Sequence, residues 1–253
     1  SLRAFTYVAA RDATGGYAKT KEEATTYREE FGQREVMVLW PNFMAWDNTG
    51  GAEGTGAAVT LAAPAYALGL RAKLDQEVGW HKNISNAVIN GPEGITVPVF
   101  FDLQNPACDA VLLNDGNVTT LIRKQGFRFW GNRTCSLEEA FAFESAARTA
   151  HVLADTMAEG MFPYVDKPLT PALVSNIIES INARLRSLKA GGYILGGKAW
   201  IDWEVNTTET LKSGKLVIDY DYAPVAPADE LELRQRVTVR YSSDWDVRVA
   251  TGQ

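Results

Sequence analysis

The side chains best suited to chemistry are two histidines and two cysteines: His81, His151, Cys108 and Cys135. Zinc sites hold such residues at short, regular spacings, and none of these four lies at one. His81 falls in an irregular segment, whereas His151 falls inside an expected helix beside apolar residues, where packing is its ordinary role. No histidine lies near Cys108 in the sequence, so we expect both cysteines to be buried. The sequence therefore predicts no metal site and no cofactor.

Hydrolase and nucleotide-binding motifs are also missing from the sequence. It contains no Gly-x-Ser-x-Gly elbow, and the glycines at 50–56 (GGAEGTG) do not follow the order of a dinucleotide-binding loop. Two carboxylate pairs, Asp202 with Glu204 and Asp219 with Asp221, share expected strand faces. In a chain with 31 acidic residues, a solvated strand face is the simpler interpretation of each pair. We expect a protein that is not an enzyme.

The composition is that of a chain able to bury a hydrophobic core. Its 253 residues are 46% apolar, enough for one large or two small domains. The formal net charge of -6 argues against nucleic-acid binding, which needs clustered lysine and arginine. No apolar run approaches the roughly 18 residues of a membrane-spanning helix, and no signal-peptide pattern opens the chain. With two cysteines, synthesis in a reducing compartment is expected.

Strand and helix signals alternate through residues 1–102. The expected elements are a strand at 2–8, a helix capped by Thr20 with Glu23 and ended by Gly32, a strand at 36–40, a mostly helical stretch at 57–78 and a short strand at 97–101. This β-α-β-α order predicts parallel strands covered by helices. We expect an incomplete α/β domain that ends at residue 102.

Residues 103–253 carry longer helices and amphipathic strands. The expected elements are a helix from Asn105-Pro106 to Asn114, a hairpin joining 118–123 to 127–130, a long helix from a Ser136–Glu139 capping box to Gly160, a helix from Thr170-Pro171 to Gly191, and strands at 199–205, 216–222 and 231–239. Unpaired edges of such terminal strands invite pairing with another chain. The predicted fold class is α/β and α+β: a truncated α/β domain, then helices packed on a mixed or antiparallel sheet.

The stretch 108–135 resembles the signature of the contractile-tail sheath proteins of phages and of R-type pyocins. In that family a helix ending in Leu-Asn precedes a V-x-T-I/L-x-R strand, and G-x-R-x-W-G-N-R-T follows. The matching residues are Leu113, Asn114, Val118, Thr120, Arg123, Gly126, Arg128, Trp130, Gly131, Asn132, Arg133 and Thr134. The resemblance extends over residues 1–238. Family members are longer, so we expect this chain to lack the family's N-terminal arm and the front of its outer domain.

The resemblance implies a structural subunit and no enzymatic activity. Sheath subunits stack as six-fold discs around a tail tube, then contract after a baseplate signal and drive the tube through the host envelope for genome ejection. The implied partners are other sheath subunits, the tail tube protein, the baseplate and the tail terminator, with no nucleic acid and no membrane insertion. The implied place is the virion tail, after assembly in the host cytoplasm. A monomeric α/β binding module is the main alternative, and an α/β hydrolase that uses His81 is another.

The resemblance also suggests mechanical roles for particular residues. The three C-terminal strands are expected to form a sheet to which neighbouring subunits add their terminal strands. Its candidate inter-subunit residues are Ala199, Ile201, Trp203, Leu216, Ile218, Tyr220, Leu231, Leu233, Arg234, Arg236 and Val237. The basic residues Arg184, Arg186 and Lys189 are expected either to face an acidic tube surface or to pack inward. Within the signature, we expect Trp130 to be a core anchor, Asn132 to be a turn or capping residue, and Arg133 to be an ion-pair partner of the loop.

Overall fold

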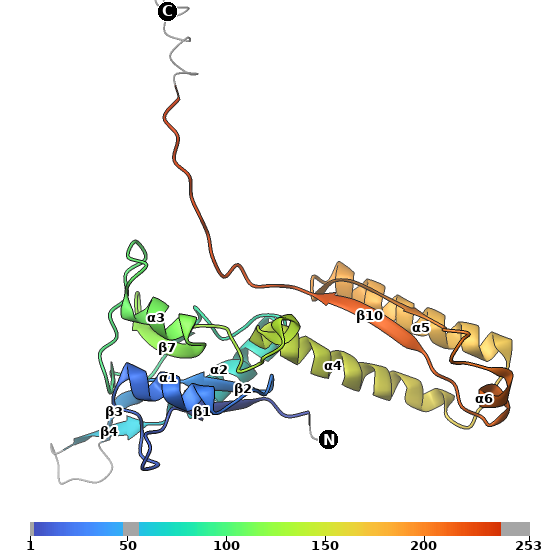
Figure 1. The fold of residues 1–253 in the computed structure, drawn as a ribbon, viewed down its shortest axis with the longest axis horizontal. Helices are drawn as coiled ribbons and strands as arrows, with labels where there is room; N and C mark the ends of the chain where they lie inside the picture. Colours follow the sequence, from blue (N-terminus) through green and yellow to red (C-terminus); the bar gives the residue numbers. More distant parts are fainter. Residues whose placement is uncertain (1–2, 48–55, 239–253) are drawn as a thin grey trace, which may run out of the picture.

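The computed structural model describes residues 3–47 and 56–238. Figure 1 shows two lobes, which we name the α/β lobe (β1 to β8 with α1 to α3) and the helical lobe (α4 to α6 with β9 and β10). Three predicted features fall partly outside the described residues. They are the start of the strand at 2–8, the glycine-rich stretch up to residue 55, and the end of the strand at 231–239.

A five-stranded mixed sheet forms the centre of the α/β lobe. Its strands, in spatial order, are β1 (Thr6–Ala9), β2 (Val36–Leu39), β7 (Val118–Arg123), β8 (Phe127–Trp130) and β5 (Val88–Ile89). The strands β1, β2 and β7 run parallel, and β8 and β5 add to them in antiparallel fashion. The parallel pairing of β1 with β2 confirms the prediction, whereas the place of β7 beside β2 was not predicted. Because the sheet combines strands from both sides of residue 102, the predicted domain boundary runs through it.

Successive side chains of a strand point to opposite faces of the sheet, so both faces of this sheet carry apolar side chains. Helices cover both faces. The covering helices are α1 (Lys21–Glu29), α2 (Ala63–Glu77) and α3 (Asp109–Asp115). Met37 and Leu39 of β2 pack in one core with Ala67 and Leu70 of α2. Between them, Val38 points the other way and joins a second core with residues of α1 and α3.

A second, antiparallel sheet corrects two predictions in this lobe. The predicted helical stretch at 57–78 is wrong at its start, since β4 (Ala57–Leu61) pairs with the unpredicted β3 (Phe43–Asp47). Pro64 lies in the first turn of α2, where proline is favoured, so the helix begins after β4 has ended. The short β6 (Gly94–Ile95) pairs with β3, whereas the predicted strand at 97–101 is irregular. Its backbone instead bonds to α3, because Ala110 N donates to the carbonyl oxygen of Phe100.

Three predicted helix starts have different outcomes. The capping box of Thr20 and Glu23 is confirmed at α1. The start at Asn105-Pro106 is wrong, because the Asn105 side chain accepts from Ala107 N in a tight turn and α3 begins later. The capping box of Ser136 and Glu139 is also wrong. The Ser136 hydroxyl accepts from Glu138 N, and a 3-10 turn precedes the long helix α4 (Glu144–Met161).

The helical lobe packs two long helices on a two-stranded antiparallel sheet. Its elements are α4, α5 (Pro171–Ala190), β9 (Ile194–Trp200), the short α6 (Thr208–Lys212) and β10 (Asp219–Pro224). Thr170 caps α5 and Gly191 follows its end, both as predicted. Leu153 and Met157 of α4 share a core with Ile181 and Leu185 of α5 and with residues of both strands.

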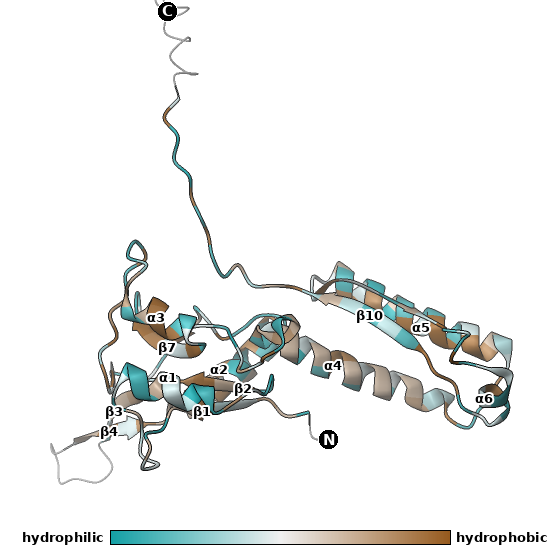
Figure 2. Ribbon diagram, viewed as in Figure 1, coloured by the Kyte–Doolittle hydropathy of each residue, from teal (hydrophilic) through white to brown (hydrophobic). Residues whose placement is uncertain are grey.

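The three predicted C-terminal strands need correction. Strand β9 lies earlier than the predicted 199–205, and residues 203–205 form a turn. Strand β10 begins later than the predicted 216–222, at Asp219. Residues 231–238 form no strand in the described chain and run away from both lobes, so we name residues 230–238 the arm and residues 225–229 the arm root (Figure 1). Figure 2 shows hydrophobic and hydrophilic residues mixed along the arm.

Candidate functional site

The signature residues gather in one place, at the end of α3 and along the predicted β7–β8 hairpin. The hairpin pairs Thr120 with Trp130 and turns through Gln125 and Gly126, both with positive φ. Leu113, Val118 and Thr120 are buried, whereas Arg123 is exposed above the ring of Phe127. Arg128 is bonded to the loop before β5, through the carbonyl oxygen of Asn86 at 2.7 Å. Trp130, expected in the core, is half-buried against Phe101.

Asn114 and Gly131 fasten the end of α3 to this hairpin. The Asn114 amide nitrogen donates to the carbonyl oxygens of Trp130 and Val118, at 2.9 and 3.1 Å, and its oxygen accepts from the indole of Trp130. Gly131 has φ of +135°, and a Cβ at that position would lie 2.8 Å from the side chains of Asn114 and Thr119. Only glycine satisfies both the conformation and the close approach.

The next residues, Asn132 to Thr134, connect the hairpin to the start of α4 and to the arm root. The Asn132 carbonyl oxygen accepts from Glu144 N, and the Thr134 hydroxyl donates to Phe141. The Asn132 amide donates to one carboxylate oxygen of Asp229 at 2.7 Å, and the Arg133 guanidinium donates to the other at 2.8 Å. Asn132, Arg133 and Asp229 form a cluster that we name the latch.

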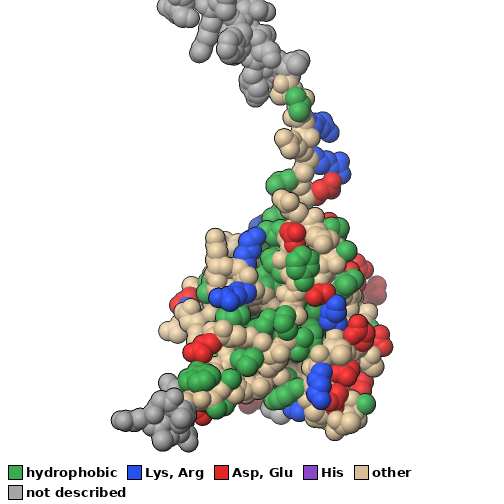
Figure 3. All heavy atoms as spheres, turned by 90° about the vertical axis from the view of Figure 1, so that its left-hand side faces the viewer, with side chains coloured by type: hydrophobic (Ala, Val, Ile, Leu, Met, Phe, Trp, Pro, Cys, Tyr) green, Lys and Arg blue, Asp and Glu red, His purple; other side chains and the backbone are tan. Residues whose placement is uncertain are grey.

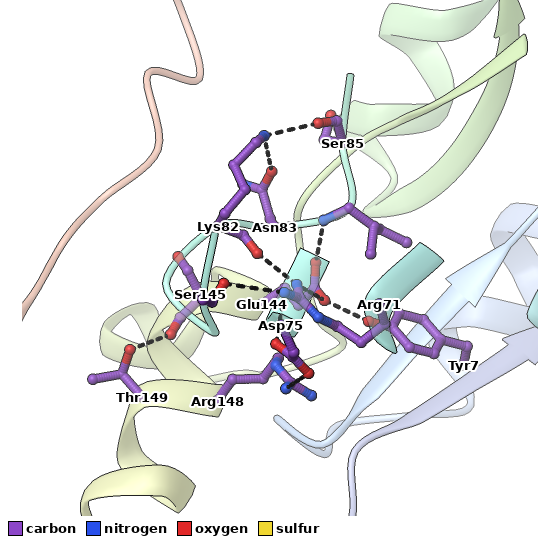
Figure 4. Close-up of polar contacts among 12 residues, drawn as sticks. Tyr7, Arg71, Asp75, Lys82, Asn83, Ser85, Glu144, Ser145, Arg148 and Thr149 are labelled. Atoms are coloured by element: carbon purple, nitrogen blue, oxygen red, sulfur yellow. Dashed lines mark hydrogen bonds and ion pairs between the residues drawn. The ribbon is translucent and has the colours of Figure 1, made fainter. Parts of the chain in front are cut away.

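A buried cluster of Tyr7, Arg71 and Glu144, which we name the joint, fastens α4 to the α/β lobe (Figure 4). Glu144 is fully buried and accepts hydrogen bonds from the Tyr7 hydroxyl, from Ile84 N at 2.9 Å and from the Arg71 guanidinium at 3.4 Å. Asp75 bridges Arg71 to Arg148 through ion pairs of 2.8 and 2.6 Å. Burial and the neighbouring Glu144 carboxylate raise the pKa of Tyr7 far above its usual range, so its hydroxyl stays a donor.

Sequence reasoning missed the joint because its members lie far apart in the chain. Glu144 and Tyr7 are separated by 137 positions, and a glutamate in the first turn of a helix is ordinary. The latch partner Asp229 was missed for the same reason, since it lies 97 positions from Asn132. Only the tertiary fold brings these residues together.

The residues first considered for chemistry do not converge. Among the described residues, no three histidine, cysteine or acidic side chains lie close enough to hold a metal ion. His81 packs against the edge of Tyr193, where burial, and secondarily Arg71, lower its pKa, and His151 lies 3.4 Å from Glu35. Both cysteines are buried as free thiols, as expected. No helix in the described part of the chain is long and apolar enough to cross a membrane.

One carboxylate of each pair, Asp202 and Asp221, has a structural role of its own. Asp202 and Glu204 do not share a strand face, because the Asp202 carboxylate accepts from Glu204 N in a turn. On β10, Asp221 accepts from the backbone of Lys198 in β9. These contacts give both aspartates structural partners.

The candidate inter-subunit residues occupy three different settings. Ala199 is buried on β9 and Tyr220 half-buried on β10, while Ile201, Trp203, Leu216 and Ile218 lie in the connection between these strands. Leu231, Leu233 and Val237 on the arm are 81%, 94% and 95% exposed. Arg234 and Arg236 share the arm, and Arg234 pairs with Glu232. Figure 3 shows apolar, basic and acidic side chains projecting along the arm.

The three candidate tube-facing residues lie in the last turns of α5, on its solvent side. Arg184, Arg186 and Lys189 are all exposed, and they alternate with the buried Leu185 and Leu188. Arg186 is partly neutralised by an ion pair with Glu179, at 2.5 Å. This end of α5 therefore presents positive charge to solvent.

Comparisons with known proteins agree with the two-lobed fold. Residues 2–135 match the phage tail sheath protein central domain, and residues 136–238 match the phage tail sheath C-terminal domain. The tail sheath protein of Escherichia phage P2 is 53% identical over 240 residues, and the major tail sheath protein of Serratia phage KSP20 is 45% identical over 240. Both alignments cover 95% of this chain and 58% of the relative, so the chain spans little more than half the length of these relatives.

Solved structures show the same fold at lower sequence identity. The PVC sheath complex of an extracellular contractile injection system, in its contracted state, superposes with a TM-score of 0.73 at 16% identity. That match covers 94% of this chain and 65% of the PVC chain. The contracted helical sheath of the anti-feeding prophage gives a TM-score of 0.71 at 21% identity, covering 92% of this chain and 61% of the other. With two family models together spanning residues 2–238, the chain belongs to the phage tail sheath family.

Proposed function

We propose that this chain forms the central and C-terminal parts of a contractile tail sheath subunit, a structural protein and not an enzyme. The observation that carries the proposal is the arm, whose leucines and valine lie almost fully in solvent. Such residues are normally buried, and three of them almost fully exposed on one short segment indicate an interaction site. We propose that a neighbouring subunit covers them.

The helical lobe offers a suitable acceptor for the arm. Among the described residues, β9 and β10 pair only with each other, so each has one unpaired edge. Unpaired edges recruit added strands through backbone hydrogen bonds. Leu195 and Trp200 on β9 are 63% and 40% exposed and supply apolar area beside that edge. We propose that the arm of one subunit adds as a strand to this sheet in the next, which keeps subunits joined during contraction.

The other proposed partners follow from the same role. The basic end of α5, with Arg184, Arg186 and Lys189, is proposed to contact an acidic surface of the tail tube. The baseplate and the tail terminator are proposed to bind the ends of the sheath. The proposed location is the virion tail, after assembly in the host cytoplasm.

Negative-stain electron microscopy tests the proposal. We would compare this chain with a chimera extended at both ends by the corresponding segments of the phage P2 relative. We expect tubes or stacked six-fold rings from the chimera, and loss of these assemblies when Leu231, Leu233 and Val237 are all replaced by serine. The control is Leu137→Ser, at an apolar residue that is 83% exposed in the α/β lobe. A chimera that assembles equally well with the serine arm would contradict the proposed role of the arm.

A further inference from the structure

The path of the arm root is unusual because it connects the two lobes. Strand β10 ends at Pro224 in the helical lobe, yet the chain then passes the start of α4 and reaches the signature in the α/β lobe (Figure 1). The Ser145 hydroxyl donates to the carbonyl oxygen of Val225 at 3.5 Å, and Asp229 enters the latch. The arm therefore leaves the subunit from the junction of the lobes rather than from the end of β10.

The latch holds the Asp229 carboxylate from two sides with donors that are themselves fixed. Asn132 is 6% exposed, and its carbonyl oxygen accepts from the first residue of α4. Arg133 pairs with Phe143 in an isolated β-bridge, and its guanidinium stacks 4.9 Å above the ring of Phe143. Such donors lose little freedom when they bind a carboxylate, so the carboxylate is held in one orientation.

Between residues 230 and 237, the arm has no described hydrogen bond or ion pair to either lobe that is comparable with the latch. Between residues 230 and 237, the described side-chain hydrogen bonds join Arg234 to Glu232 within the arm itself. The eight residue-to-residue steps from Asp229 to Val237 span about 26 Å when the chain is extended at about 3.3 Å per step. A rotation of about 10° at Asp229 then moves the far end by about one interstrand spacing of 4.8 Å.

We propose that Asn132 and Arg133 are positioning residues that set the direction in which the arm leaves the subunit, by holding Asp229. This inference rests on the proposed function of the arm. It assigns Asn132 and Arg133 of the signature a role beyond local packing. An exposed ion pair contributes little to folding stability. Fixing the direction of the arm therefore explains the Arg133–Asp229 pair better than stabilising the fold does. The latch joins the arm to the α/β lobe, so any reorientation of that lobe redirects the arm.

The first test measures the direction of the arm in this chain alone. Spin labels at Leu231→Cys on the arm and Thr26→Cys on α1 report their distance distribution by double electron–electron resonance. Both native cysteines are fully buried, which directs labelling to the new sites. We expect the distribution to broaden at least twofold in Asp229→Ala and in Arg133→Ala. The control Glu179→Gln breaks another exposed ion pair, with Arg186, and should leave the distribution unchanged.

The second test measures assembly of the chimera described above. We expect Asp229→Ala to reduce the number of tubes at least fivefold while the folded fraction stays constant. The charge exchange, Arg133→Asp combined with Asp229→Arg, should restore part of the lost number of tubes. An unchanged distance distribution, or normal assembly despite a broadened one, would overturn the latch. If the serine arm also assembles normally, the proposed function of the arm fails instead, and the distance measurement still reports whether the latch fixes its direction.

Discussion

The joint and the latch both connect the lobes near the start of α4, and they differ in burial. Glu144 and Arg71 of the joint are 0% and 4% exposed, whereas the side chains of Arg133 and Asp229 in the latch are 41% and 38% exposed. Removing one partner from a buried charge pair leaves an uncompensated charge, while exposed pairs contribute little. Charged contacts of a similar kind therefore hold the lobes together in the joint, where they are buried, and orient the arm in the latch, where they are exposed.

The largest effect is expected in the joint. Replacing Glu144 by Gln removes the fully buried one of the two carboxylates that pair with Arg71, the other being Asp75, and weakens the bonds from Tyr7 and Ile84. We expect the free energy of unfolding to fall by about 3–5 kcal/mol in urea titrations. Glu179→Gln is the matched control, and it should change that free energy by no more than about 0.5 kcal/mol. A loss below about 1 kcal/mol in Glu144→Gln would remove the contrast between the two clusters.

A smaller effect is expected at the glycine that lies between the hairpin and the latch. Gly131→Ala forces an unfavourable backbone conformation and a contact of 2.8 Å, so we expect a loss of about 1–3 kcal/mol in unfolding free energy. Gly69→Ala, inside α2 with open space around it, should instead stabilise the chain by about 0.5–1 kcal/mol. Opposite signs for the two variants in thermal unfolding would confirm this difference, and equal signs would contradict it.

The surroundings of His81 predict that stability depends on pH. Burial, and secondarily the charge of Arg71, lower the pKa of His81 below 6.5, so the unfolded chain binds a proton more readily than the folded chain. The stability due to neutral His81 is therefore present above pH 6.5 and is lost as the pH falls through its folded pKa. Urea titrations across this window should show a weaker pH dependence in His81→Gln than in the parent. Parallel curves would show that His81 is not responsible.

Local patterns in the sequence predicted the elements that local chemistry specifies. The capping box at Thr20, the turn at Gln125-Gly126 and the apolar run of β2 each contain their own signal and are confirmed. Strand β9 was misplaced because its glycines weaken the strand pattern. Gly197 is nevertheless required, since a Cβ there would lie 2.7 Å from the Asp221 carbonyl oxygen. That requirement arises from pairing with β10 and is invisible in the local sequence.

The candidate site shows the same limit at longer range. The signature identified Asn132 and Arg133, and Arg133 does form an ion pair, but its partner Asp229 lies in the arm root rather than in the same loop. Asp229 is one acid among many in an acidic chain. Nothing around Asp229 distinguishes it from the other carboxylates until the fold brings the arm root to the hairpin. The alternation along 231–239 predicted a strand, but the described residues 231–238 form none. No described strand lies beside the arm to pair with it.

The smallest stability effect is expected in the latch, and it sharpens the comparison most. Asp229→Asn keeps an acceptor for Asn132 and removes the charge that pairs with Arg133. Because this pair is exposed, we expect the unfolding free energy to change by no more than about 1 kcal/mol. Proteolysis within residues 225–230 should nevertheless accelerate, since cleavage requires the arm root to leave its anchor. A stability loss as large as that of Glu144→Gln would mean that the latch holds the lobes together rather than directing the arm.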